Sequence, residues 1–382
     1  MDAYRQVVLT ARPKGLPRAG DFRLETGPMP EPLEGQVLVA TKFLSLDPYM
    51  RGRMNDAESY APPVNVGGVM EGEVVAEVVR SRHPSFSRGE LVQGRIGWRT
   101  HAAVAPQELK KVETGLNPPE TSLGVLGMPG FTAYAGLQAI GQPKPGETVV
   151  VSSAAGAVGS VVGQLAQLAG ARAVGIAGGA AKCAHVRDEL RFDAVVDHKA
   201  RGLSKVLAAA CPDGIDVYFE NVGGQIWNMV LPLLNRYARI PVCGLIAHYN
   251  GDAPTEPNSV AETMLTVLRR SLLIRGFINT EFAPALYPAF LSEITPLVHS
   301  GRIRYREHVV DGLEAAPQAF IGMLEGHNFG KTLVRVSCSG KAARRVNIDH
   351  GHREIVAARA CRISSTALSV LSSYQRRHFL RM

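Results

Sequence analysis

The sequence has few cysteines and no long apolar run. Its 382 residues contain five cysteines, an odd number, and no two of them form a Cys-x-x-Cys pair. Neither a disulfide framework nor a cysteine-based zinc site is therefore predicted. No apolar stretch reaches the roughly 18 residues that a membrane span requires, and the first residues lack the apolar core and cleavage site of a signal peptide. We therefore expect a cytoplasmic protein that has no membrane segment.

Net positive charge is scarce outside the C-terminal tail. The formal net charge is +8, but nine basic and two acidic residues lie in 337–382, so the tail carries +7 and the rest of the chain about +1. A nearly neutral body gives no electrostatic reason to expect nucleic-acid binding. We expect the tail to be disordered apart from at most one weak helix, and we assign it no catalytic role.

A glycine-rich turn between two β-branched runs is the most informative motif. Residues 148–151 predict a strand buried on both faces, because the run is too short for a buried helix. The turn that follows, Ala154-Ala155-Gly156-Ala157-Val158-Gly159, is the dinucleotide-binding fingerprint with Ala in place of its first Gly. Gly156 would let the backbone approach a pyrophosphate, and Gly159 would let the next helix pack close to the strand. That helix and a second strand at 172–177 supply the context that the fingerprint requires.

A carboxylate is missing where an NAD site would have one. NAD sites usually place Asp or Glu about 20 residues beyond the glycines, to bind the ribose 2′-hydroxyl. Here Ala177-Gly178-Gly179 occupies that place, and Lys182 follows. The missing anion and the nearby cation favour the 2′-phosphate of NADP. A surface lysine beside a tight turn would give the same pattern.

The pattern of strands and helices changes at about residue 125. Before it, short β-like runs at 36–40, 69–79, 90–96 and 101–104 predict a small, mostly antiparallel barrel-like domain. After it, strands alternate with helices six times, which is the pattern of a doubly wound parallel sheet. Its last helices and strands include a helix from Gly223-Gly224 through Leu234 and a strand at 238–245. The predicted fold class is therefore α/β, with a substrate domain at 1–125, completed by about 302–336, and a Rossmann NADP-binding domain at 126–301.

Five further motifs resemble those of one family. They are Leu46–Met54 (LDPYMRGRM), Gly127–Tyr134 (GMPGFTAY), Tyr218–Gly224 (YFENVGG), Val242–Ile246 (VCGLI) and Asn328–Thr332 (NFGKT). From about residue 5 to 336, the chain resembles the zinc-independent, NADPH-dependent branch of the medium-chain dehydrogenase/reductase superfamily. Within that branch it is most similar to the prostaglandin reductase, alkenal double-bond reductase and curcumin reductase group.

The resemblance implies a GroES-like barrel, a Rossmann domain, an active site between them and a homodimer. It also implies chemistry without a metal. Zinc-dependent relatives carry a Cys-Asp ligand set and a Gly-His-Glu segment. The corresponding segments here, Leu46-Asp47 and 68–72, lack that Cys and that His.

The resemblance also assigns candidate site residues. Tyr249 takes the place of the family's active-site tyrosine, and Tyr49 is a second catalytic candidate; either phenol could instead only pack on the cofactor or shape the pocket. The expected cofactor residues are Ala155, Gly156, Ala157 and Val158 at the pyrophosphate, Gly178, Lys182 and His198 at the 2′-phosphate, and Asn221, Cys243, Gly244, Tyr249 and Asn328 near the nicotinamide and ribose. His198 stands where family members usually carry Tyr, and Asp197 beside it makes the local charge ambiguous. For Asn328, a plain turn before Gly330 is an alternative.

The leading functional hypothesis is reduction of an enal or enone by NADPH. Hydride would go to the β-carbon, and the negative charge that develops on the carbonyl oxygen would be stabilised by a phenol. A quinone reductase is a second hypothesis, because quinones are cyclic enones. A non-enzymatic NADPH-binding protein is a third. The loops at 55–66 and 250–259 would set the substrate.

Overall fold

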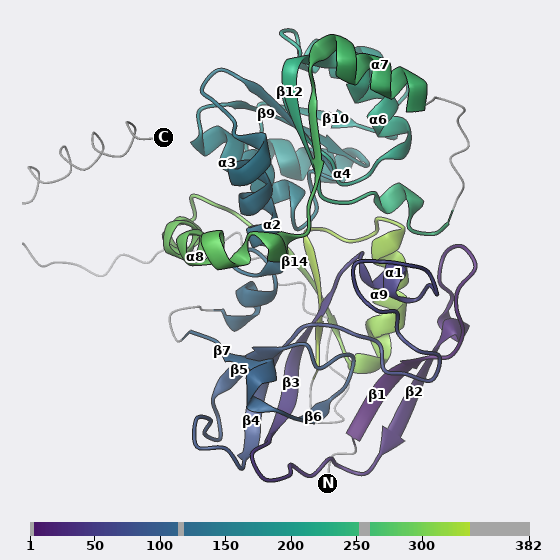
Figure 1. Ribbon diagram of the computed structural model, residues 1–382, viewed down its shortest axis with the longest axis vertical. Helices are drawn as coiled ribbons and strands as arrows, with labels where there is room; N and C mark the ends of the chain where they lie inside the picture. Colours follow the sequence, from purple (N-terminus) through teal and green to yellow (C-terminus); the bar gives the residue numbers. More distant parts are fainter. Residues whose placement is uncertain (1–3, 114–117, 252–259, 337–382) are drawn as a thin grey trace, which may run out of the picture. The chain divides into compact units, whose positions relative to one another are not determined.

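The computed structural model describes residues 4–113, 118–251 and 260–336. The tail at 337–382 and most of the loop at 250–259 lie outside these ranges, so the predictions made for them are not addressed by the structure. Within the described residues, two sheets carry most of the strands, and Figure 1 shows them one above the other.

The first sheet is parallel and has the order β10-β9-β8-β11-β12-β13. Its strands are β8 (Thr148–Ser152), β9 (Arg172–Ala177), β10 (Ala194–Asp197), β11 (Ile215–Phe219), β12 (Leu234–Val242) and β13 (Leu273–Gly276). This order reverses direction at β8, as in a doubly wound Rossmann sheet. The fold class predicted for this half of the chain is therefore confirmed.

Helices cover both faces of the parallel sheet. Val149 and Val151 of β8 belong to one apolar core, together with α2 (Met128–Gly136), α3 (Gly159–Leu168) and α8 (Ala283–His299). Val150 belongs to a second core, on the side of α5 (Leu203–Ala210) and α6 (Gly224–Val230). Successive side chains of a strand point to opposite faces, so a strand covered on both sides must be apolar throughout.

One predicted boundary of this sheet is wrong. The helix expected to run through Leu234 ends at Val230, and a short 3₁₀ turn at Leu231–Leu233 follows it. Pro232 lies in that turn, and proline is not tolerated in a helix interior because it lacks the N–H and clashes with the preceding turn. Strand β12 consequently starts at Leu234, earlier than the expected 238.

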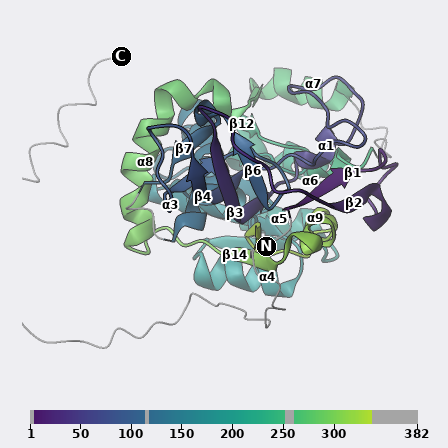
Figure 2. The same cartoon turned by 90° about the horizontal axis from the view of Figure 1, so that it is seen from below.

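The second sheet is mostly antiparallel and has the order β14-β15-β3-β4-β5-β7, with β6 also paired to β3. Its strands are β3 (Val37–Leu46), β4 (Val74–Ser81), β5 (Leu91–Gly94), β6 (His101–Val104), β7 (Leu109–Lys111), β14 (Glu307–Asp311) and β15 (Lys331–Arg335). Only β14 and β15 run parallel to each other in this set. Figure 2 shows β3, β4, β6 and β7 from below. Because β15 pairs with β3, the end of the described chain is built into the N-terminal sheet.

Two features of this half differ from the expected strands. A hairpin of β1 (Tyr4–Leu9) and β2 (Phe22–Gly27) precedes the sheet and was not predicted. The strand expected at 69–79 begins only at Val74. Phe22 of the hairpin stacks on Trp98, and both rings contact Phe320 of α9 (Ala316–Leu324), so this core joins residues from the two ends of the described chain.

Candidate functional site

The fingerprint turn connects β8 to α3 and is tightly folded. A Cβ placed on Gly159 would lie 2.3 Å from the carbonyl oxygen of Ser153, so only glycine lets the helix start this close to the strand. The Gly156 carbonyl accepts the N–H of Ser160 at 3.0 Å, which begins α3. In the described part of the chain, the N–H groups of Ala157 and Val158 have no hydrogen-bond acceptor. Free N–H groups at the start of a helix suit an anion such as a pyrophosphate.

Five other predicted cofactor positions lie just after the ends of neighbouring parallel strands. Gly178 follows β9, His198 follows β10, Asn221 follows β11, and Cys243 and Gly244 follow β12. Parallel strands point their carboxyl ends the same way, so these residues share one edge of the sheet with the fingerprint. Ligands of doubly wound folds bind at that edge, next to the strand where the order reverses.

Asp197 binds the main chain of the neighbouring turn. Its Oδ1 accepts the backbone N–H groups of Gly179 and Lys199, each at 2.9 Å. These bonds lower the pKa of the Asp197 carboxyl and hold the carboxylate against the turn between β9 and α4 (Ala180–Ala184). His198 lies against Gly178, where an added Cβ would be 2.5 Å from its Nε2. Burial, and then the charge of Lys199, lower the pKa of His198.

Lys182 lies near this turn and adds a second cation. Its Nζ donates to the carbonyl of Gly326 at 2.7 Å and lies 5.7 Å from the centre of the Phe329 ring. Burial, followed by repulsion from Lys199, lowers the pKa of Lys182. Lys182, His198 and Lys199 therefore form a basic group whose mutual repulsion a phosphate would relieve. Lys199 was not predicted, although its place beside His198 was a usable signal.

The two predicted asparagines are engaged by the main chain. Asn221 Nδ2 donates to the Ser152 carbonyl at 2.8 Å, which joins the ends of β8 and β11. Asn328 Nδ2 donates to the Gly330 carbonyl at 2.9 Å, the bond of a local turn. That turn contacts the fingerprint, because the Gly330 N–H donates to the carbonyl of Ala155 at 2.9 Å.

Tyr249 lies in the loop that follows β12, after a 3₁₀ turn at Ile246–His248. Its Oη accepts the N–H of Leu245 at 3.4 Å, which directs the ring back over Gly244. Burial raises the pKa of Tyr249, against the hydrogen bond from Leu245, and Cys243 and Tyr60 raise it further, so the phenol is protonated at neutral pH. It can therefore donate a hydrogen bond or a proton.

Tyr49 reaches the site from the other sheet. It precedes α1 (Met50–Arg53), and burial, followed by the charges of Asp47 and Glu71, raises its pKa well above the ordinary value. The guanidinium of Arg53 lies 4.3 Å from the ring centre of Tyr60 and 5.9 Å from that of Tyr49. Tyr60 thus lies close to both candidate tyrosines. The sequence suggested only that its loop sets the substrate.

A lysine pairs with Asp47 in the segment where zinc-dependent relatives carry a ligand. Lys331 Nζ forms a buried ion pair with Asp47 and donates to the Leu46 carbonyl at 2.9 Å. An ammonium group therefore already balances this carboxylate, whose side chain is 6% exposed. Among the residues of the described ranges, no three His, Cys, Asp or Glu side chains are grouped as metal ligands would be.

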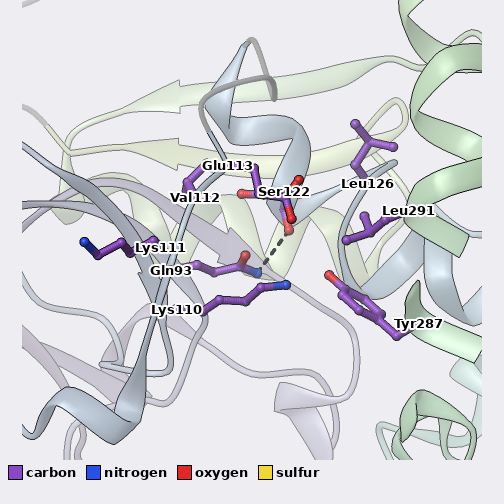
Figure 3. Close-up of a pocket in the computed structure, with 9 residues that line it drawn as sticks. All are labelled: Gln93, Lys110, Lys111, Val112, Glu113, Ser122, Leu126, Tyr287 and Leu291. Carbon is purple, nitrogen blue, oxygen red and sulfur yellow. Dashed lines mark hydrogen bonds between the residues drawn. The ribbon is translucent and has the colours of Figure 1, made fainter. Parts of the chain in front are cut away.

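A separate hollow lies between the β5–β7 edge and α8 (Figure 3). Its lining includes Gln93, Lys110, Ser122 and Tyr287, and Gln93 Nε2 donates to the Ser122 carbonyl at 3.1 Å. None of the predicted cofactor or catalytic residues lines it. We therefore assign it no part in the reaction.

The site combines a fingerprint turn, a basic group near the neighbouring strand ends and protonated phenols. These features, on a fold of two sheets, define a dinucleotide-dependent oxidoreductase. Comparisons with known proteins agree. Residues 5–112 match the family model described as the N-terminal domain of oxidoreductase, and residues 157–295 match the model described as zinc-binding dehydrogenase. No helix of the described ranges is long and apolar enough to cross a membrane.

Individual relatives cover most of the chain. The NADPH-dependent curcumin reductase of Escherichia coli (strain K12) is 50% identical over 87% of this chain and 97% of its own. The 2-alkenal reductase (NADP(+)-dependent) of Nicotiana tabacum is 38% identical over 87% and 97%. The crystal structure of CurA from Vibrio vulnificus in complex with NADPH matches with a TM-score of 0.85 at 48% identity, over 87% of this chain and 99% of that one.

The chain therefore belongs to the medium-chain dehydrogenase/reductase superfamily, in the group of NADPH-dependent reductases that contains the curcumin, prostaglandin and alkenal reductases. The predicted family, fold class and cofactor are confirmed.

Proposed function

We propose that the protein is a cytoplasmic, zinc-independent reductase that uses NADPH to reduce the carbon–carbon double bond of α,β-unsaturated aldehydes and ketones. The observation that carries this proposal is the pairing of a basic group near the β9 and β10 ends with the protonated phenol of Tyr249 in the loop after β12. The names of the curcumin and 2-alkenal reductases support the substrate class, because both substrates contain a double bond conjugated to a carbonyl.

The basic group is proposed to hold the 2′-phosphate. Lys182 and Lys199 supply charge, and His198 can accept a proton and donate to a phosphate oxygen. The N–H groups of Ala157 and Val158 are proposed to bind the pyrophosphate at the start of α3. Bound there, NADPH would supply the hydride.

The phenol of Tyr249 is proposed to bind the substrate carbonyl. Its raised pKa keeps it protonated, so it donates a hydrogen bond to the oxygen on which negative charge develops. Tyr49 is proposed to shape the opposite wall from the N-terminal sheet. With Lys331 already balancing Asp47, polarisation of the carbonyl rests on hydrogen bonds.

An assay with three substrate types tests the proposal. Purified protein is supplied with NADPH carrying deuterium in the transferred position and with a simple enal, an enone or a quinone, and the products are identified. We expect the saturated aldehyde or ketone with deuterium on the β-carbon. An allylic alcohol would contradict double-bond reduction, and turnover of the quinone alone would indicate a quinone reductase. Tight binding of NADPH without any turnover would indicate a non-enzymatic binding protein.

A homodimer is also proposed, with β13 as its contact. This strand ends the parallel sheet, and Leu273 and Ile274 are exposed on it. Val260, Met264 and Leu268 make the neighbouring face of α7 (Val260–Arg270) apolar and exposed. Light scattering should give twice the chain mass of 41.0 kDa. Leu268→Glu should yield the single chain, while Val206→Glu, at an exposed position on α5, should not; a monomeric wild type would contradict this proposal.

A further inference from the structure

Glu220, at the end of β11, is a buried carboxylate that the proposed reaction does not use. Only 2% of the residue is exposed. Its Oε1 accepts four hydrogen bonds of 2.7–3.0 Å, from Ser152 Oγ, Tyr218 Oη and the N–H groups of Val222 and Gly223. Its Oε2 is buried without a partner. A buried carboxylate with one saturated oxygen and one oxygen without a partner costs the folded state free energy.

The turn that Glu220 fixes is the template for the Tyr249 loop. Four backbone hydrogen bonds of 2.9–3.2 Å connect the two segments, from the N–H groups of Cys243, Gly244, Ile246 and Ala247 to the carbonyls of Glu220, Asn221 and Val222. The side chain of Glu220 fixes residues 220–223 through the N–H groups of Val222 and Gly223. Residues 220–222 in turn bind the start of the Tyr249 loop, residues 243–247. Displacing the carboxylate would therefore move the loop that positions Tyr249.

The charge of Glu220 acts on the same side of the site. No Lys, Arg or His of the described ranges lies within ion-pair distance of its carboxylate. Burial, followed by this negative charge, raises the pKa of the Cys243 thiol to about 12. Cys243 and Gly244 are expected on the ribose side of the cofactor, and Asn221, which directly follows Glu220, is expected near the nicotinamide. The uncompensated charge therefore lies beside the region assigned to the nicotinamide.

We propose that Glu220 is a positioning residue that holds the Tyr249 loop and, through its unpaired charge, favours oxidised over reduced cofactor. The nicotinamide ring is neutral in NADPH and positively charged in NADP⁺. A fixed negative charge in a poorly solvated region stabilises the charged ring more than the neutral one. Hydride donation, in which the ring loses two electrons and one hydrogen nucleus to the β-carbon, becomes more favourable. This inference rests on the proposed function.

Glu220→Gln tests the role of the charge by binding alone. The amide oxygen can accept the same four hydrogen bonds, but the negative charge is gone. Dissociation constants of NADPH and NADP⁺ are measured without substrate, by nicotinamide fluorescence and by displacement. We expect the ratio of the NADP⁺ constant to the NADPH constant to rise by about threefold to tenfold. An unchanged ratio in a folded variant would overturn the inference.

Two further variants keep the test decisive. Tyr218→Phe removes one hydrogen-bond donor from Oε1 and leaves the negative charge less neutralised. The ratio of the two dissociation constants should therefore fall below that of the wild type. A ratio that stays the same or rises contradicts the inference, even where Glu220→Gln does not fold. Glu73→Gln makes the same exchange at a carboxyl of the other sheet, bonded to Gln93, and should leave the ratio unchanged.

The wild type separates this inference from the proposed function. If it binds neither nucleotide, both are overturned. If it binds both nucleotides and the ratio does not respond to Glu220→Gln, only the role of Glu220 is overturned. Glu220→Asp keeps the negative charge but has a shorter side chain, which reaches the turn less well. If this variant loses turnover while its ratio of dissociation constants stays that of the wild type, Glu220 positions the Tyr249 loop.

Discussion

The carboxyl group of Glu307 on β14 lies near Lys331 and Glu120. Burial, and then the charge of Glu120, raise its pKa from 4.5 to about 7, against the opposing effect of Lys331. Its Oε1 is buried without a hydrogen-bond partner, so nothing compensates the ionised form at that atom. Ionisation of Glu307 should therefore cost the folded state free energy.

The sign of the pH dependence follows from the two pKa values. Between the unfolded value of 4.5 and the folded value of about 7, the folded protein binds the proton more tightly than the unfolded chain. Stability therefore falls as the pH rises through this window and levels off above it. At about 1.4 kcal/mol for each pH unit between the two values, the full cost is about 3 kcal/mol, of which about 2 kcal/mol falls between pH ~5.5 and ~8.5.

Glu307→Gln removes this titration while keeping the shape of the side chain. Urea unfolding of the wild type and the variant is compared at the two pH values. At the higher pH, we expect the variant to be more stable than the wild type. The difference in unfolding free energy between the variant and the wild type should be about 2 kcal/mol larger there than at the lower pH. Glu34→Gln, at an exposed carboxyl, should follow the wild type at both. If Glu307→Gln shows the same pH dependence as the wild type, the pKa of Glu307 is not raised in the folded protein.

Three further predictions concern the site. Lys182→Ala should weaken NADPH binding by about 10- to 100-fold, the loss of one charge-assisted contact, and leave NADH binding nearly unchanged; an unchanged preference measured by fluorescence titration would place the phosphate elsewhere. Tyr249→Phe should lower turnover by about 100-fold or more with little change in NADPH affinity, whereas Tyr237→Phe, an exposed tyrosine of β12, should do neither; full turnover would remove Tyr249 from the mechanism. Gly159→Ala should lower the thermal midpoint of unfolding and abolish NADPH binding, because its methyl group would lie 2.3 Å from the preceding turn. Gly20→Ala should do neither, because its methyl group would meet nothing within 4 Å. Equal effects of the two substitutions would refute the steric reason given for Gly159.

Much of the parallel sheet could be predicted because its strands are short β-branched runs with clear stops. The observed bounds of β9 equal the expected 172–177. The β1–β2 hairpin was missed because β2 is short and three of its six residues, Arg23, Glu25 and Thr26, are exposed or half-exposed polar ones. The end of α6 was missed although Pro232 marks it, so in that case the signal was present.

The parts of the site formed by residues close together in the sequence could be predicted. The parts formed by residues far apart in the sequence could not. The fingerprint and Lys182 lie within one βαβ unit, so their spacing alone suggests their roles. The ion pair of Asp47 and Lys331 joins positions 284 apart in the sequence. Likewise, only the fold places Ser152 against Glu220, 68 positions away. No local pattern specifies such contacts, because they depend on which strands become neighbours.

Gly330 and Lys331 join the two halves of the proposed site through successive residues. Gly330 donates its N–H to Ala155 in the fingerprint turn, and Lys331 forms the buried ion pair with Asp47, two positions before Tyr49. Gly330 has a φ of +61°, and a Cβ there would lie 1.9 Å from a backbone oxygen, so this chain path requires glycine. Through this ion pair, the start of the loop that carries Tyr49 lies directly against β15. The strand that completes the N-terminal sheet is thus also the strand that fixes Tyr49 relative to the turn proposed to bind the pyrophosphate.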